Sequence, residues 1–385
     1  MMERFHTLLH EREQAGLLRS LPSIEARREG RILHHGQSLL DFSGNDYLGL
    51  SHHPMLTEAA QRALEALGTG ATASRLLSGD LSLHHELERR TAIFKGKPSA
   101  LIFNSGYQAN VGLISCLCQR GDRVLCDRLS HASLLDGARL SGAKLERFRH
   151  NDVDHLGDLL GKSDGKAQRR LVITESLFSM EGDLAPLRAI VALKERHEFE
   201  LFVDEAHATG LFDGSGSGLA AQAGVTDQVD YLMGTFSKAL GSFGGYVACD
   251  QAAKDYFINA CRSFIYSTAL PPAVIAANLA ALKLVETEPQ RRETLRRRAD
   301  HFRRALRREG LEVLGASQIV PVILGDPAHC LSVSETLRDE GYWVLPIRPP
   351  TVPEGMARLR FSLTYWHGED VLDALAHRLG RLCHV

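Results

Sequence analysis

The chain has 385 residues, of which 44% are hydrophobic and 24% charged, and its 45 basic and 47 acidic residues give a net charge of −2. Such a composition is typical of a globular protein with more than one core, and its near-neutral charge gives no general attraction to nucleic acid or anionic membranes. The seven cysteines form no C-x-x-C pair. We therefore expect no disulfide framework and no structural metal site, and a cytoplasmic location.

The N-terminal stretch 3–19 has apolar residues at helical spacing, namely Phe5, Leu8 and Leu9. It predicts an amphipathic helix that ends before Leu21-Pro22. No apolar run reaches the ~18 residues of a membrane span, and the acidic residues of this stretch argue against a targeting presequence. We expect an N-terminal arm over residues 1–45.

From residue 99 onward, short apolar runs alternate with helical stretches. The alternation predicts a mostly parallel central sheet with helices on both faces, an α/β domain over residues 46–280. A helix from 273 to about 310, broken near Pro289, leads to a smaller C-terminal α/β domain over 281–385. The expected strands are 100–103, 123–126, 171–174, 201–203, 230–233, 245–248, 319–324 and 358–363; the expected helices include 55–67, 107–118, 132–140, 186–197, 330–340 and 369–381.

Lys238 lies among small and hydroxylated residues after one of these apolar runs. A lysine forms a Schiff base only as a neutral amine, which a partly desolvated site favours. Upstream, the run 201–203 delivers Asp204, and His207 follows. Ligands bind beyond the carboxyl ends of strands in open α/β sheets, so we expect the three side chains to share one crevice. A carboxylate that keeps a pyridine nitrogen protonated, an imidazole and a lysine are the groups that pyridoxal 5'-phosphate (PLP) requires.

Asp204-Glu205-Ala206-His207, followed by Thr235-Phe236-Ser237-Lys238, resembles the α-oxoamine synthase family. The resemblance implies the PLP-dependent transferase fold type I (aspartate aminotransferase-like), a homodimer, and the decarboxylative condensation of an amino acid with an acyl thioester. Similar motifs run nearly from end to end of the chain: Asn45-Asp46-Tyr47-Leu48-Gly49-Leu50, Asn104-Ser105-Gly106-Tyr107-Gln108-Ala109-Asn110, Asp127-Arg128-Leu129-Ser130-His131-Ala132-Ser133 and Glu175-Ser176-Leu177-Phe178-Ser179-Met180-Glu181-Gly182-Asp183.

The resemblance also implies roles for single residues. Lys238, Asp204 and His131 would be catalytic, with His131 stacked on the cofactor ring and also contacting substrate. Cofactor binding would fall to Lys238 and Asp204 together with Gly106, Tyr107, Ser179, His207 and Thr235. Gly106 and Tyr107 stand where a strand passes into a helix, whose free N–H groups bind phosphate. Thr268 is left unassigned, because its role depends on dimer geometry.

One stretch of the sequence favours particular substrates for this reaction, namely Arg348-Pro349-Pro350-Thr351-Val352-Pro353. Two prolines rigidify a loop that presents Thr351, and Arg19 in the arm would pair with a terminal carboxylate. We expect L-alanine and a pimeloyl thioester, of coenzyme A or an acyl-carrier protein. Whether Arg19 or Arg348 holds a substrate carboxylate stays open, as do the sibling activities of a glycine C-acetyltransferase or a 5-aminolevulinate synthase.

Two other classes of protein, an oxidoreductase and a non-catalytic scaffold, are alternatives to this interpretation. Gly68-Thr69-Gly70-Ala71-Thr72-Ala73 partly matches the G-x-G-x-x-A pattern of a nicotinamide-dependent oxidoreductase. That loop follows the helix predicted at 55–67 where the pattern requires a strand, which argues against a dinucleotide site. A non-catalytic scaffold would not need lysine, aspartate and histidine together.

Overall fold

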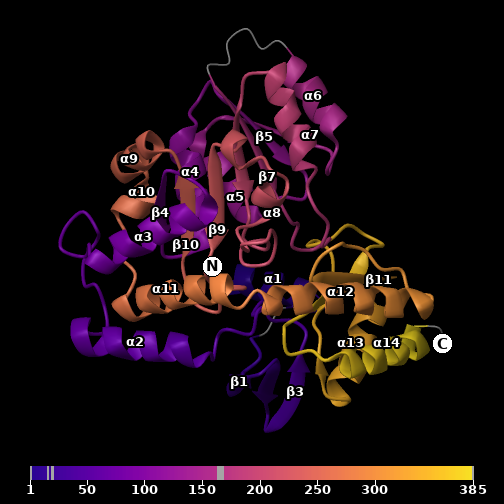
Figure 1. The fold of residues 1–385 in the computed structure, drawn as a ribbon. Coiled ribbons are helices and arrows are strands. Elements are labelled where there is room, and N and C mark those ends of the chain that lie inside the picture. Colours follow the sequence, from indigo (N-terminus) through magenta and orange to yellow (C-terminus); the bar gives the residue numbers. More distant parts are fainter. Residues whose placement is uncertain (1, 15–16, 19–20, 163–168, 384–385) are drawn as a thin grey trace.

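The computed structural model describes residues 2–14, 17–18, 21–162 and 169–383. A seven-stranded sheet in the order β4-β10-β9-β8-β7-β5-β6 forms its centre (Figure 1). Strand β10 is antiparallel to both neighbours and every other neighbouring pair is parallel, so the predicted mostly parallel sheet is confirmed. The strands are β4 Ser99–Phe103, β5 Arg123–Asp127, β6 Lys144–Phe148, β7 Arg170–Glu175, β8 Glu200–Asp204, β9 Tyr231–Thr235 and β10 Gly245–Cys249.

Helices cover both faces of this sheet, which is why most of its strands are apolar throughout. In β4, Leu101 and Phe103 belong to the core on one face, and Ala100 and Ile102 to the core on the other. The first face is covered by α4 Gly106–Leu117, α5 Ala132–Ser141, α9 Gln251–Ala260 and α10 Arg262–Ile265. The second is covered by α3 Ser82–Lys95, α6 Val153–Gly161, α7 Leu187–Ala192, α8 Leu219–Gln222 and α11 Pro272–Thr287, with α2 Pro54–Leu67 packed on α11.

The C-terminal part has its own small sheet, in the order β11-β14-β13. Its strands are β11 Ile319–Gly325, β14 Ala357–Ser362 and β13 Pro346–Ile347, and its helices are α12 Gln290–Arg308, α13 Pro327–Asp339 and α14 Glu369–Cys383. Strand β12 (Tyr342–Trp343) pairs in parallel with β3 (Gln37–Asp41), and so joins this part to the N-terminal sheet completed by β1 Ala26–Arg28 and β2 Arg31–His34. The domain boundaries at 45/46 and 280/281 stay predictions.

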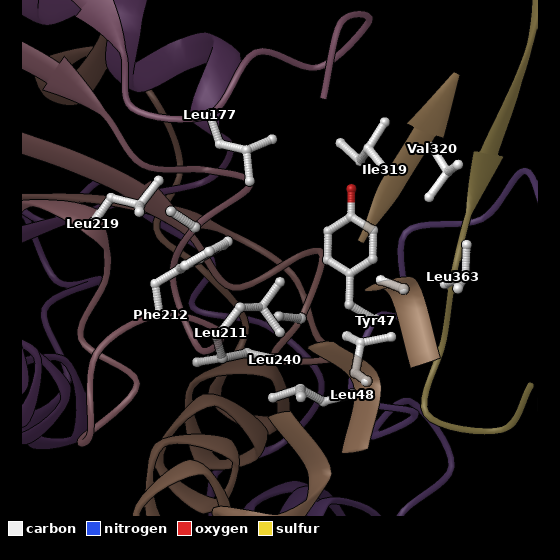
Figure 2. Close-up of a cluster of buried hydrophobic side chains, with 14 of the residues drawn as sticks. Tyr47, Leu48, Leu177, Leu211, Phe212, Leu219, Leu240, Ile319, Val320 and Leu363 are labelled. Carbon is white, nitrogen blue, oxygen red and sulfur yellow. The ribbon is translucent and has the colours of Figure 1, made fainter. Parts of the chain in front are cut away.

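One continuous core runs between the main sheet and the C-terminal part. In Figure 2, Leu211 and Leu240 of the main domain lie on one side of Tyr47, and the C-terminal residues Val320 and Leu363 lie on the other. All of these side chains are buried. The segment around Tyr47 is therefore packed between the two parts of the chain.

The predicted helix 3–19 is too long. Helix α1 is Met2–Gln14, and residues 17 and 18 are not helical. The predicted break near Pro289 is confirmed, since α11 ends at Thr287 and Pro289 caps α12. Among the described residues, no helix is both long and apolar enough to cross a membrane.

Candidate active site

Asp204 ends β8 and is almost fully buried. Its Oδ2 accepts a hydrogen bond from Asn110 Nδ2 at 2.8 Å, and its Oδ1 accepts one from the backbone N–H of Ala206 at 2.8 Å. The same Asn110 amide also donates to Ser133 Oγ at 2.9 Å. A buried carboxylate must be hydrogen-bonded, and the donors Asn110 of α4 and the backbone N–H of Ala206 fix the orientation of Asp204, while Ser133 of α5 holds the Asn110 amide.

Lys238 follows β9 and faces His207, with 2.8 Å between Lys238 Nζ and His207 Nε2. Burial lowers the pKa of Lys238 to about 8, although the charges of Asp204 and Glu175 oppose the shift. Burial, reinforced by the positive charges of Lys238 and Arg360, holds the pKa of His207 well below its usual range. At neutral pH the site therefore contains a neutral imidazole beside a lysine that loses its proton readily.

A pocket of about 230 Å³ lies beyond the carboxyl ends of β7 and β8 and the N-terminal end of α4. Seven of the predicted site residues line it: Gly106, Tyr107, His131, Asp204, His207, Thr235 and Lys238. Helix α4 begins there, with Ser105 as N-cap, and offers free backbone N–H groups to an anion. The fold therefore brings these residues together from four separate segments of the chain.

A glycine makes room for this arrangement where β10 passes the start of α4. A β-carbon added at Gly245 would lie 2.8 Å from the backbone nitrogen of Gly106, closer than such atoms approach. Only glycine allows this contact between strand and helix terminus. Thr235, on the neighbouring strand, donates a hydrogen bond from Oγ1 to the carbonyl oxygen of Gly244 at 2.7 Å. This bond holds together the two ends of the loop 236–244, which carries Lys238.

Two of the predicted residues do not line this pocket, and a third is not described. Ser179 follows β7 and does not line the pocket; its carbonyl oxygen accepts a hydrogen bond from Arg360 Nε. Thr351 lines a second pocket of about 260 Å³, together with Arg12 of α1 and Arg348. Arg19 lies outside the described residues. The roles of all three stay predictions.

Several residues at or beside the pocket were not predicted from the sequence. Glu175, at the end of β7, accepts a hydrogen bond from the backbone N–H of His131 at 2.6 Å. Burial and then the neighbouring Asp204 carboxylate raise the pKa of Glu175 well above its usual range. Its position directly after an apolar run was a usable signal, the same one that identified Asp204. Asn110, which also lines the pocket, and Tyr47, which contacts His207, carried no such signal.

The model of the family "Aminotransferase class I and II" matches residues 37–379. The chain belongs to this family. It is 45% identical over 383 residues to an 8-amino-7-oxononanoate synthase from Geotalea daltonii, with 98% of each chain covered. These matches confirm the family and the fold expected from the motifs.

Two solved structures are similar to the whole or most of the chain. A lysine-to-alanine variant of serine palmitoyltransferase from S. paucimobilis, with a bound PLP–myriocin aldimine, has a TM-score of 0.94 at 31% identity and covers 99% of this chain and 98% of its own. An 8-amino-7-oxononanoate synthase from Francisella tularensis has a TM-score of 0.78 at 29% identity, covering 89% and 97%.

Proposed function

We propose that this protein is a PLP-dependent acyltransferase that condenses L-alanine with a pimeloyl thioester, giving 8-amino-7-oxononanoate, carbon dioxide and a free thiol. The observation that carries this proposal is the full-length 45% identity to an 8-amino-7-oxononanoate synthase. Identity to the serine palmitoyltransferase is lower, at 31%, although its fold is equally well matched. Similarity of fold alone does not choose between members that share a cofactor.

The residues of the 230 Å³ pocket fit PLP. Lys238 offers a buried amine with a pKa of about 8 for covalent attachment. Asp204 is held by Asn110 and would pair with the pyridine nitrogen, while the N-terminus of α4 at Gly106 would receive the phosphate. These residues thus offer a partner for the aldehyde, the ring nitrogen and the phosphate of the cofactor.

When bound, PLP supplies an electron sink for the carbanion at the Cα atom of the amino acid. Lys238, as a neutral amine, would remove the Cα proton, and Asp204 would keep the sink effective by holding a proton on the ring nitrogen. The Cα atom then forms a bond to the thioester carbonyl carbon as the C–S bond breaks. The leaving thiolate takes up a proton from solvent, and loss of the alanine carboxylate as carbon dioxide with return of a proton from Lys238 to Cα completes the balance.

The second pocket, of about 260 Å³, would receive the far end of the acyl chain. Arg12, Arg348 and Thr351 line it. A pimeloyl chain ends in a carboxyl or ester group, and arginine pairs with carboxylates through two parallel hydrogen bonds. Arg12 thereby joins Arg19 as a candidate for this contact, whereas Arg348 is also a candidate for the alanine carboxylate.

We also propose a homodimer in the cytosol. Leu76, Leu77 and Tyr266 are 50%, 80% and 72% exposed in the single chain, and a backbone bridge between Ser74 and Thr268 holds their two segments together. Large exposed apolar side chains that gather in one place favour an interface. The seven cysteines are all free thiols, which favours a reducing compartment. Sedimentation velocity should show a dimer for the wild type and a shift to monomer for Leu77→Glu.

The test of the reaction is a comparison of kcat/KM for four pairs of amino acid and thioester. Alanine with a pimeloyl thioester should exceed glycine with an acetyl or succinyl thioester, and serine with a palmitoyl thioester. Each pimeloyl assay uses both coenzyme A and acyl-carrier protein as the thiol. A preference for any of the other three pairs would assign the protein to a sibling activity.

The acyl contact is tested by Arg12→Ala and Arg19→Ala, which should raise KM for the pimeloyl donor more than KM for alanine. The matched control is Arg4→Ala, an exposed arginine on the same helix as Arg12 that does not line the pocket. Equal effects on both KM values would mean that the arginines act only through packing of the arm.

A further inference from the structure

Tyr47 belongs to the stretch Asn45–Leu50, which the motif comparison singled out and to which no role has been given. Its side chain is 0% exposed. Figure 2 shows its ring among apolar side chains, with the hydroxyl directed away from Leu48 and lying near Ile319. A buried phenol in such surroundings requires hydrogen-bond partners, because water cannot supply them.

His207 and Asn45 are two of the partners of the Tyr47 hydroxyl, beside Arg360, Gln318 and Ser362. The hydroxyl oxygen lies 2.7 Å from His207 Nδ1 and 3.1 Å from Asn45 Oδ1. The other ring nitrogen of His207, Nε2, lies 2.8 Å from Lys238 Nζ. The four side chains form one row of hydrogen bonds, which begins at the candidate catalytic lysine and ends at an amide oxygen.

The two ends of this row fix the direction of every hydrogen bond in it. A lysine ammonium only donates, so His207 Nε2 must accept from it. The Asn45 side-chain oxygen can only accept hydrogen bonds. It also accepts one from Arg360 Nη2 at 3.4 Å, and this contact identifies which atom of the Asn45 amide is the oxygen. Burial raises the pKa of Tyr47, so the phenol keeps its one proton and donates it to Asn45. The neutral His207 ring then carries its proton on Nδ1 and donates it to the Tyr47 oxygen.

We infer that Tyr47 is a positioning residue for Lys238: by accepting a hydrogen bond from Nδ1–H of His207, it leaves Nε2 free to accept one from Lys238. The row stabilises the protonated lysine against the desolvation that favours the neutral amine. It thereby keeps the pKa of the Lys238 amine close to the working pH, where the amine can both release and take up a proton. This inference deepens the proposed function, since it concerns the same lysine, but it is tested without substrate or cofactor.

The test is Tyr47→Phe in the ligand-free full-length protein. Without the phenol oxygen, the His207 proton moves to Nε2, which then points an N–H group at the lysine. The protonated lysine loses an acceptor, and we expect the midpoint of its labelling curve to fall by about one pH unit. The curve is the rate of Lys238 acetylation by acetic anhydride between pH 6 and 10, followed by mass spectrometry. The other titratable or charged groups that face this lysine and His207 are unchanged in the variant: Asp204, Glu175, His131 and Arg360.

The matched control is Tyr246→Phe. Tyr246 is also 0% exposed, and its hydroxyl bonds to Thr209 Oγ1 at 2.8 Å, away from His207. This variant also removes one buried tyrosine hydroxyl, and it should leave the midpoint of the Lys238 labelling curve unchanged. A second variant, Asn45→Ala, removes the acceptor of the Tyr47 proton. The phenol should then donate to Nδ1 of His207, and the midpoint should fall as it does in Tyr47→Phe.

The histidine proton is observed directly by ¹⁵N NMR of protein labelled at histidine, with the His207 signal identified by its loss in His207→Gln. The wild type should show Nδ1–H, and both Tyr47→Phe and Asn45→Ala should show Nε2–H. If Tyr47→Phe does not fold, as judged by circular dichroism, Asn45→Ala decides alone. An unchanged midpoint and an unchanged tautomer in a folded variant would overturn the inference, whatever the outcome of the substrate assays.

Discussion

Lys95 and Glu205 form a buried ion pair next to Asp204, at the end of β8. Its contribution to the free energy of unfolding can be tested quantitatively. Both side chains are 0% exposed, and Lys95 Nζ donates to Glu205 and to the carbonyl oxygen of Ser217. Glu205 also accepts from the backbone N–H of Ala220 at 2.8 Å. Lys95→Met keeps most of the volume and leaves the Glu205 carboxylate buried without a cation. Breaking a buried pair in this way costs about 3–5 kcal/mol of the free energy of unfolding.

The assay is urea unfolding followed by circular dichroism, with the shift in midpoint converted through the m-value. The control is Arg297→Met, which breaks the pair between Arg297 and Glu369, whose atoms lie 3.4 Å apart and whose side chains are 67% and 44% exposed. An exposed pair contributes at most about 1 kcal/mol. The double variant Lys95→Met/Glu205→Gln removes the unpaired charge and should be more stable than Lys95→Met alone. If Lys95→Met lost no more stability than Arg297→Met, the buried-charge reasoning would be wrong.

Two further predictions concern the pocket. Asp204→Asn should still bind PLP, seen by visible absorbance, but should lose most of kcat, because an amide cannot stabilise a protonated pyridine nitrogen as a carboxylate does; wild-type rates would remove Asp204 from its role. Gly245→Ala should weaken PLP binding and lower the free energy of unfolding by about 1–3 kcal/mol, because its β-carbon meets Gly106 N at 2.8 Å, whereas Gly70→Ala, with open space around it, should do neither.

The sequence was sufficient for the parts of the site that depend on local order. Asp204 and Lys238 each follow an apolar run, and the carboxyl ends of parallel strands meet at one edge of a sheet, so their meeting followed from the alternation alone. Strand β6 was not predicted because its residues, Lys144–Phe148, are mostly only partly buried or exposed, as suits an edge strand. Helical spacing also did not locate the end of α1.

The contacts that the sequence could not supply join residues far apart in the chain. Tyr47 and His207 are 160 positions apart, and Lys95 and Glu205 are 110 apart. Each pair depends on how α3 and the Asn45–Leu50 segment pack on the sheet, which no local pattern encodes. Asp204 and Lys238 could be identified one at a time, whereas the groups that set their protonation could be found only from the packed structure.

His150 is another residue whose role could be found only from the packed structure. It lies outside the pocket and bridges two loops that lead to it. Its Nδ1 lies 3.0 Å from Asp127 Oδ1, and its Nε2 lies 2.8 Å from Asp183 Oδ2. An imidazole between two carboxylates donates from both nitrogens only as a cation. Burial alone would lower the pKa of His150, but the hydrogen bonds and charges of Asp127 and Asp183 raise it to about 10. The cation therefore ties the loop that carries His131 to the loop that carries Ser179.

This geometry predicts the sign of a pH effect on stability. The pKa of an unfolded histidine is about 6.5, so between that pH and about 10 the folded chain holds a proton at His150 that the unfolded chain has released. Stability from this group is complete below pH 6.5 and is lost as pH rises towards 10. His150→Gln should therefore melt at a lower temperature than wild type at pH 6.5, with the difference narrowing by pH 10. His85→Gln, which breaks an exposed pair with Asp80, should follow the wild-type melting curve throughout. A difference for His150→Gln that stays constant from pH 6.5 to 10 would mean that the residue acts through packing on Phe178 and not through its charge.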